Sequence, residues 1–229
     1  MQFLRRLAVV LVVCSGLVAA GWAQFGGMGK GMGQTPQIPG VFRPVVGTGA
    51  QYQVTQKGKN MSWAVAVVGK ESVDGNDGYW LEMRMEGGEQ GGMIMKSLTV
   101  ARDGGGAEIK RMIMQPPGQP PMEMPMEMMG MMRQGQKQAA NEEALGEKVG
   151  TETVTVPAGT FTCDHYRSKH GNEPADVWIS AKVPPYGLIK MTSASSTMVL
   201  EKVLSNETSK IKGEPQKMDF GMPGGRRPK

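Results

Sequence analysis

Cysteine and histidine are almost absent from this chain, which has two of each among 229 residues. Cys14 lies in an apolar run near the N-terminus, so Cys163 is the only cysteine left if that run is removed. One cysteine forms no intramolecular disulfide, and the fold must rest on its core and its sheet. Cys163, His165 and His170 could supply three metal ligands, but a fourth ligand and a Cys-x-x-Cys pair are missing. Neither histidine accompanies a nucleophile motif, so we expect no enzyme.

A run long enough to cross a membrane is also missing at the N-terminus. Leu7 to Ala20 is apolar apart from three residues, which is short for a transmembrane helix. Arg5 and Arg6 precede it and small residues follow, as in a secretory signal peptide over residues 1–24, with cleavage near Ala23 or Gln24. We therefore expect a periplasmic or secreted protein, and a retained membrane anchor is the alternative.

A strong excess of charge of one sign is absent as well. Without Arg5 and Arg6, 24 basic and 21 acidic side chains remain, a net charge of +3. This is too small to indicate a nucleic-acid partner. Part of it lies in the C-terminal Arg226, Arg227 and Lys229, which leaves room for peripheral contact with an anionic membrane surface. The number of subunits does not follow from the sequence.

The pattern that is present is one of short strands separated by turns, such as Asp74–Gly78 and Pro157–Gly159. We predict about nine or ten strands and little helix, hence an all-β or β-dominated fold: a curved antiparallel sheet or half-open barrel. The predicted strands are 51–55, 62–72, 79–86, 93–100, 108–115, 151–156, 161–168, 176–180, 187–191 and 197–204.

The domain boundaries follow from composition. Residues 25–41 are rich in Gly and Met and are expected to form a disordered leader. A single β domain is expected over 42–205, with a Met-rich insertion at 116–145 that includes a short helix over 134–145. Residues 206–229 are expected to be a polar and largely disordered tail.

Methionine is abundant, and seven of the eleven residues from Met122 to Met132 are methionine. Thioether sulfur is a soft ligand that favours Cu(I) or Ag(I), and it needs no deprotonation. The alternatives are a flexible greasy lid over an apolar groove and a bias of composition. The metal hypothesis uses Met122, Met124, Met126, Met128, Met129, Met131 and Met132.

Three segments carry a resemblance: Val154–Phe161 (VTVPAGTF), Asp176–Ser180 (DVWIS) and Val183–Lys190 (VPPYGLIK). Together they resemble the C-terminal half of exported bacterial proteins of uncharacterised function, which are similar to the periplasmic lipoprotein-carrier superfamily. That resemblance implies a curved, half-open antiparallel sheet around a hydrophobic cavity, and binding of a lipid or a lipidated protein. The Met-rich insertion is extra to those carriers.

One apolar face of the sheet is the candidate binding surface. Leu81, Met83 and Met85 alternate with Trp80, Glu82 and Arg84, so they share one face of a strand. We expect non-catalytic binding of a hydrophobic small molecule or a lipidated protein there, with no cofactor; the alternative is a Cu(I) or Ag(I) protein. The candidate lining, which could equally fill a closed core, is Trp63, Leu81, Met83, Met85, Trp178, Leu188 and Ile189.

Overall fold

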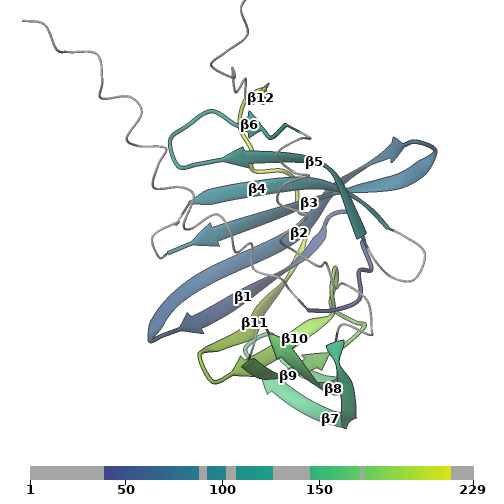
Figure 1. Cartoon of the computed structure of the whole chain (residues 1–229), viewed down its shortest axis with the longest axis vertical. Coiled ribbons are helices and arrows are strands. Elements are labelled where there is room, and N and C mark those ends of the chain that lie inside the picture. The colour runs from purple at the N-terminus through teal and green to yellow at the C-terminus, as the bar shows by residue number, and fades with distance from the viewer. Residues whose placement is uncertain (1–38, 88–91, 102–106, 126–144, 171–172, 218–229) are drawn as a thin grey trace, which may run out of the picture. The chain divides into compact units, whose positions relative to one another are not determined.

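The computed structural model describes residues 39–87, 92–101, 107–125, 145–170 and 173–217. Every element in these residues is a strand, and the strands form one open, curved sheet in the order β12-β6-β5-β4-β3-β2-β1-β11-β10-β9-β8-β7 (Figure 1). The predicted all-β, half-open barrel is confirmed. The predicted signal peptide, residues 25–38 of the leader and residues 134–144 of the helix expected over 134–145 lie outside the described residues.

The strands agree with the predicted ones except at their ends, and two more join them. A hairpin turn forms within the predicted segment Asp74–Gly78 but has only two residues, because β3 begins at Asn76. Asp74 and Gly75 both have positive φ, at 51° and 79°, which a tight two-residue turn requires. The bounds are β1 Thr48–Gln56, β2 Lys59–Val73, β3 Asn76–Glu86, β4 Met93–Ala101, β5 Ala107–Gln115, β6 Met122–Glu123, β7 Glu147–Val156, β8 Gly159–His170, β9 Glu173–Ile179, β10 Leu188–Ser193, β11 Ser196–Ser205 and β12 Gln216–Lys217.

Two antiparallel meanders share this sheet. β1 to β6 lie side by side in chain order, and so do β7 to β11. β1 joins the two meanders by pairing with β11, with Val54 opposite Met198. At the far end the hairpin of β7 and β8 contacts β10 and β11, and the amide of Ala158 donates to the carbonyl of Leu200 at 3.4 Å. The sheet therefore curls most strongly around β10 and β11.

The two faces of β1 to β5 differ in what covers them. Tyr52, Val54, Val65 and Leu81 belong to the larger apolar cluster, which includes Leu188 of β10. We call the face that carries these residues the inner face. The Tyr52 hydroxyl donates to the carbonyl of Leu188 at 3.2 Å, which ties β1 to β10 across the inside of the curl.

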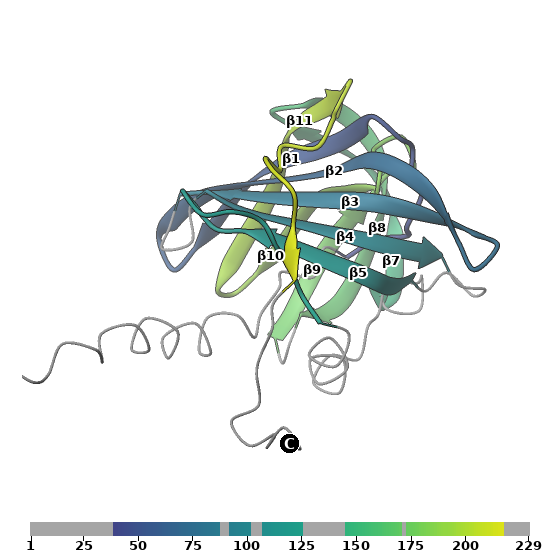
Figure 2. The same ribbon diagram turned by 90° about the horizontal axis from the view of Figure 1, so that it is seen from above.

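The opposite, outer face of β3 to β5 carries a second, smaller cluster. Trp80, Leu98 and Ile113 form this cluster, and Ile211 packs against it. Ile211 belongs to the segment after β11, which runs across β3, β4 and β5 before it ends as β12 beside β6 (Figure 2). The described chain therefore stays on the sheet through Lys217, beyond the domain end predicted at residue 205.

Candidate functional site

Four of the seven predicted lining residues lie together on the inner face. Trp63 is opposite Met85, Val65 is opposite Met83 and Val67 is opposite Leu81, so the four share one face of β2 and β3. Met83 and Trp63 are partly buried and pack against the larger cluster. Leu188 and Ile189 belong to the same cluster, but both are 0% exposed and fill its centre.

Trp178 does not share that face. It alternates along β9 with the buried Val177 and Ile179, and the His165 ring stacks on it at 4.6 Å between ring centres. Lys190 of β10 is directly opposite Trp178, and its ammonium lies 4.9 Å from the centre of the Trp178 ring. Trp178 therefore takes part in a polar cluster, although its side chain also packs against the larger apolar cluster.

His165 is the centre of that polar cluster. Its Nδ1 lies 3.1 Å from a Glu152 oxygen and its Nε2 lies 3.0 Å from an Asp176 oxygen. The bond from His165 lowers the pKa of Asp176, and Arg167 adds to the effect. His165 therefore lies between two carboxylates, an arrangement that suits a structural role for its ring.

Cys163 is buried at 1% exposure, and burial raises the pKa of its thiol to about 11. The nearby carboxylates of Glu152 and Asp164 contribute to this raised pKa, so the thiol stays protonated at neutral pH. His170 is the end residue of β8, and its side chain lies outside the described part. In the described residues, no three His, Cys, Asp or Glu side chains gather as a metal site.

The inner face of β3 to β6 holds a feature that sequence reasoning missed. β3, β4 and β5 each carry a Met-x-Met pair and a fourth pair begins in β6. The register places the first six methionines and Met122 on one face. The sequence signal was the recurrence of the pair in successive strands. The pairs are Met83 and Met85, Met93 and Met95, Met112 and Met114, and Met122 and Met124.

These pairs align into a row across the sheet. Met83 is opposite Met95, Met95 is opposite Met114, and Met114 is opposite Met122. We call these four residues the methionine row. Met114 is buried at 4% exposure, and the other three side chains are partly buried.

The methionine run begins within this face. Met122 is the last residue of the row. Met124 follows it in the chain and is only 3% exposed, and the Met124 amide donates to the carbonyl of Met112 at 2.9 Å. The other predicted metal ligands of the run, Met126, Met128, Met129, Met131 and Met132, lie outside the described residues. The structure thus joins the start of the run to the strand methionines.

Trp63 adds one polar group without a hydrogen-bond partner to the inner face. Its indole Nε1 is buried and has no hydrogen-bond partner. Among the described residues, no other buried side-chain nitrogen or oxygen lacks one. Trp80 on the outer face differs, because its Nε1 donates to Glu71 at 2.9 Å. An unsatisfied buried donor costs about 1–3 kcal/mol, so the Trp63 N–H favours any group that can accept from it.

The outer face, by contrast, is covered by the C-terminal segment and by cations. The Glu82 carboxylate accepts bonds from the Ser209 hydroxyl at 2.7 Å and from the Lys210 amide at 3.0 Å. Lys96 and Arg111 lie 4.7 and 5.3 Å from the centre of the Trp80 ring. These contacts cover the outer face of β3 to β5.

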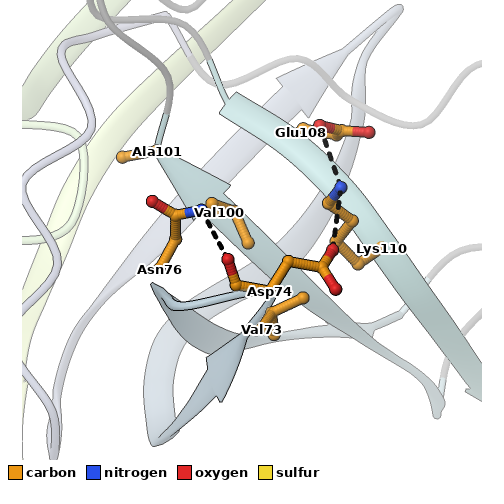
Figure 3. A pocket seen from close by; sticks show the side chains of 7 residues that line it. All are labelled: Val73, Asp74, Asn76, Val100, Ala101, Glu108 and Lys110. Carbon is orange, nitrogen blue, oxygen red and sulfur yellow. Dashed lines mark hydrogen bonds and ion pairs between the residues drawn. The ribbon is translucent and has the colours of Figure 1, made fainter.

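A separate depression lies where the β2–β3 turn meets the ends of β4 and β5 (Figure 3). Its volume is about 410 Å³, and Lys110 bridges Asp74 at 3.8 Å and Glu108 at 3.3 Å within it. Val73, Asn76, Val100 and Ala101 complete the lining. None of the predicted site residues lies there, and its exposed polar lining does not match an apolar ligand.

The fold and the inner face together define an all-β protein with one open, curved sheet and a Met-rich apolar surface. No protein-family model matches the chain, and no curated protein matches it. In the part of the chain that the structure describes, no helix has the length and apolar character to span a membrane.

Two solved structures are similar to the chain. One is a candidate exported protein with a YmcC-like fold from Bacteroides fragilis, at 12% identity and a TM-score of 0.37, covering 72% of this chain and 99% of that one. The other is a candidate lipoprotein from Parabacteroides distasonis, at 14% identity and a TM-score of 0.36, covering 73% of this chain and 100% of that one.

Proposed function

We propose that the protein binds a hydrophobic ligand, such as a lipid, an acyl chain or the acylated segment of a lipoprotein, on the inner face of β2 to β6. The observation that carries this proposal is the partly buried row of methionines beside the unpartnered N–H of Trp63. Methionine side chains are flexible and polarizable, so they suit acyl chains of varied shape.

The unpartnered N–H of the Trp63 indole favours a ligand that also carries a hydrogen-bond acceptor. Binding that buries the inner face leaves the N–H in an apolar surrounding, where a carbonyl or ester oxygen of the ligand can accept its bond. The ligand class is therefore an apolar chain that carries a hydrogen-bond acceptor. A periplasmic or secreted location, as the N-terminal segment predicts, is where lipids and lipoproteins need a carrier.

Displacement of a fluorescent fatty acid from the purified mature protein tests this function. Met95→Glu places a charge on the inner face and is expected to weaken binding about tenfold or more, because an unpaired buried charge is costly. Ile94→Glu is the matched control, since Ile94 is also partly buried but is opposite Arg84 on the outer face. Equal binding by both variants would contradict the proposal.

Trp63→Phe isolates the role of the indole N–H. The substitution removes the N–H together with part of the ring, and the loss of the hydrogen bond is expected to weaken a carbonyl-bearing ligand by about three- to tenfold. Trp80→Phe is the control, because the Trp80 N–H already donates to Glu71 on the other face. A ligand without an acceptor is expected to bind Trp63→Phe as well as the unchanged protein.

A further inference from the structure

The structure assigns a second property to the inner face: we infer that the methionine row, Met83, Met95, Met114 and Met122, is a thioether site for a soft monovalent metal ion, Cu(I) or Ag(I). This site differs from the one that the sequence suggested, which lay in the run from Met122 to Met132. It does not depend on the proposed binding of a hydrophobic ligand.

The register of the sheet places the four methionine side chains next to one another on one face. The three pairs of the row are directly opposed across antiparallel strands. Directly opposed residues on one face have Cβ atoms about 5 Å apart. Because a methionine side chain has three rotatable bonds, neighbouring sulfurs can turn toward one ion without a change in the backbone.

The chemistry of the row favours a soft ion of low charge. Thioether sulfur selects Cu(I) over harder cations such as Mg²⁺ or Ca²⁺. The ligands are neutral and lose no proton on binding, whereas a thiolate site would need a thiol such as that of Cys163, whose pKa is raised by burial.

Access distinguishes the row from other methionines in the sheet. Met191 and Met198 are also directly opposed, across β10 and β11, but they are only 3% and 2% exposed. Met83, Met95 and Met122 are partly buried, so an ion can reach their side chains from solvent. The core pair is therefore a natural control for the row.

Anaerobic titration of the mature protein with Cu(I), in competition with a chromogenic Cu(I) chelator, tests the site. Combined Met→Leu substitution of the four row residues is expected to weaken binding about tenfold or more. Combined Met191→Leu and Met198→Leu is expected to leave the affinity unchanged. The unchanged protein is assayed separately for Cu(I) and for displacement of the fluorescent fatty acid, so failure of one proposal can be told apart from failure of the other.

A third variant separates the row from the run. Met→Leu at residues 126, 128, 129, 131 and 132 removes the thioethers of the run beyond Met124 and leaves the row complete. This variant is expected to keep a Cu(I) ion. Loss of Cu(I) from this variant with retention in the row variant would overturn the assignment, and so would an unchanged protein that binds no Cu(I).

X-ray absorption gives a test that does not depend on how the row variant folds. The run variant is combined with Cys163→Ala, so every sulfur left in the mature chain belongs to methionine. Copper bound to it is expected to show sulfur neighbours alone. Nitrogen or oxygen neighbours in place of sulfur would overturn the thioether site.

Discussion

Glu82 is fully buried on the outer face, and no other charged side chain is buried among the described residues. Its carboxylate accepts from Ser209 and from the Lys210 amide, and Arg84 approaches it at 3.4 Å. Hydrogen bonds to a charged group are stronger than neutral ones, so the cost of burial is offset only while these partners remain.

We expect Glu82→Gln to lower the free energy of unfolding by about 1–3 kcal/mol. The glutamine amide has the shape of the carboxylate but no charge, and its NH₂ group would face the Ser209 and Lys210 groups that donate to Glu82. Urea unfolding measures this change. Glu86→Gln, at the exposed end of the same strand, is the control and should change stability by less than about 0.5 kcal/mol. An unchanged midpoint for Glu82→Gln would show that the buried bonds contribute little.

Cys163 illustrates a residue whose surroundings remove its reactivity. Burial raises the pKa of the thiol from 9.0 to about 11, which lowers the thiolate fraction at pH 8 by about 100-fold. We expect a disulfide reagent to modify the native protein at least about 100-fold more slowly than the urea-unfolded chain. Comparable rates in the two states would mean that the thiol is accessible, and the protein would then be open to intermolecular pairing.

At the scale of elements, the segment from residue 206 to β12 holds the outer face closed. Glu207 pairs with Arg84 at 2.8 Å, Gln115 exchanges bonds with Lys212, and Ile211 packs on the outer cluster. β12 then adds a parallel partner to β6 at the edge of the sheet. The segment therefore serves both as a cover for apolar side chains and as an edge strand.

A chain that ends at residue 206 is expected to be less stable than a chain that ends at Lys217 by about 3–5 kcal/mol, since truncation removes the hydrogen bonds from Ser209 and Lys210 to Glu82 and the packing of Ile211. Denaturant unfolding of the two chains measures the difference. In the shorter chain Glu82→Gln should cost much less than in the longer one, because coupled contacts are not additive. Equal effects of Glu82→Gln in both chains would contradict the coupling.

The same segment shows what the sequence could and could not reveal. Ten strands of five or more residues were predicted, because alternation and turn residues mark them. β6 and β12 have two residues each, too few for any alternation, and their partners lie far apart in the chain. Residues 206–217 are polar, and their contacts with Glu82 and Arg84 depend on the folded sheet.

The candidate site was predictable to a similar degree. Alternation placed Leu81, Met83 and Met85 on one face, as the structure has them. It also grouped Trp178 with the apolar lining, although the register puts that side chain beside His165 and Lys190. The methionine row depends on which residues are opposed across strands, and register is set by turns and bulges that composition does not reveal.

For the whole molecule, the curled sheet encloses hydroxyl and thiol groups that resist ionisation. Tyr186 packs against Phe42 at 5.6 Å between ring centres, and burial raises its pKa to about 12. Burial likewise raises the pKa of Tyr52, whose hydroxyl bonds to Leu188. Cys163 adds a third such group. The folded state therefore holds protons that the unfolded chain releases at lower pH.

The sign of the pH dependence follows from this difference. Each group has a folded pKa above its unfolded value, so its contribution is fully present below the unfolded pKa and is lost as pH rises through the folded one. The protein is expected to lose stability from about pH 9 upward, by about 1.4 kcal/mol for each unit of raised pKa. Urea unfolding at pH 8, 10 and 11 measures the slope.

Two substitutions test whether the loss of stability at high pH comes from the buried thiol and phenol groups. Cys163→Ala removes the group that titrates first, so the decrease in stability between pH 9 and 11 should become smaller, whatever the cost of the lost sulfur at pH 8. Tyr186→Phe keeps the contact with Phe42 and should reduce the decrease above about pH 10. If both variants kept the slope of the unchanged protein, the loss would come from the general rise in negative charge and not from groups inside the curl.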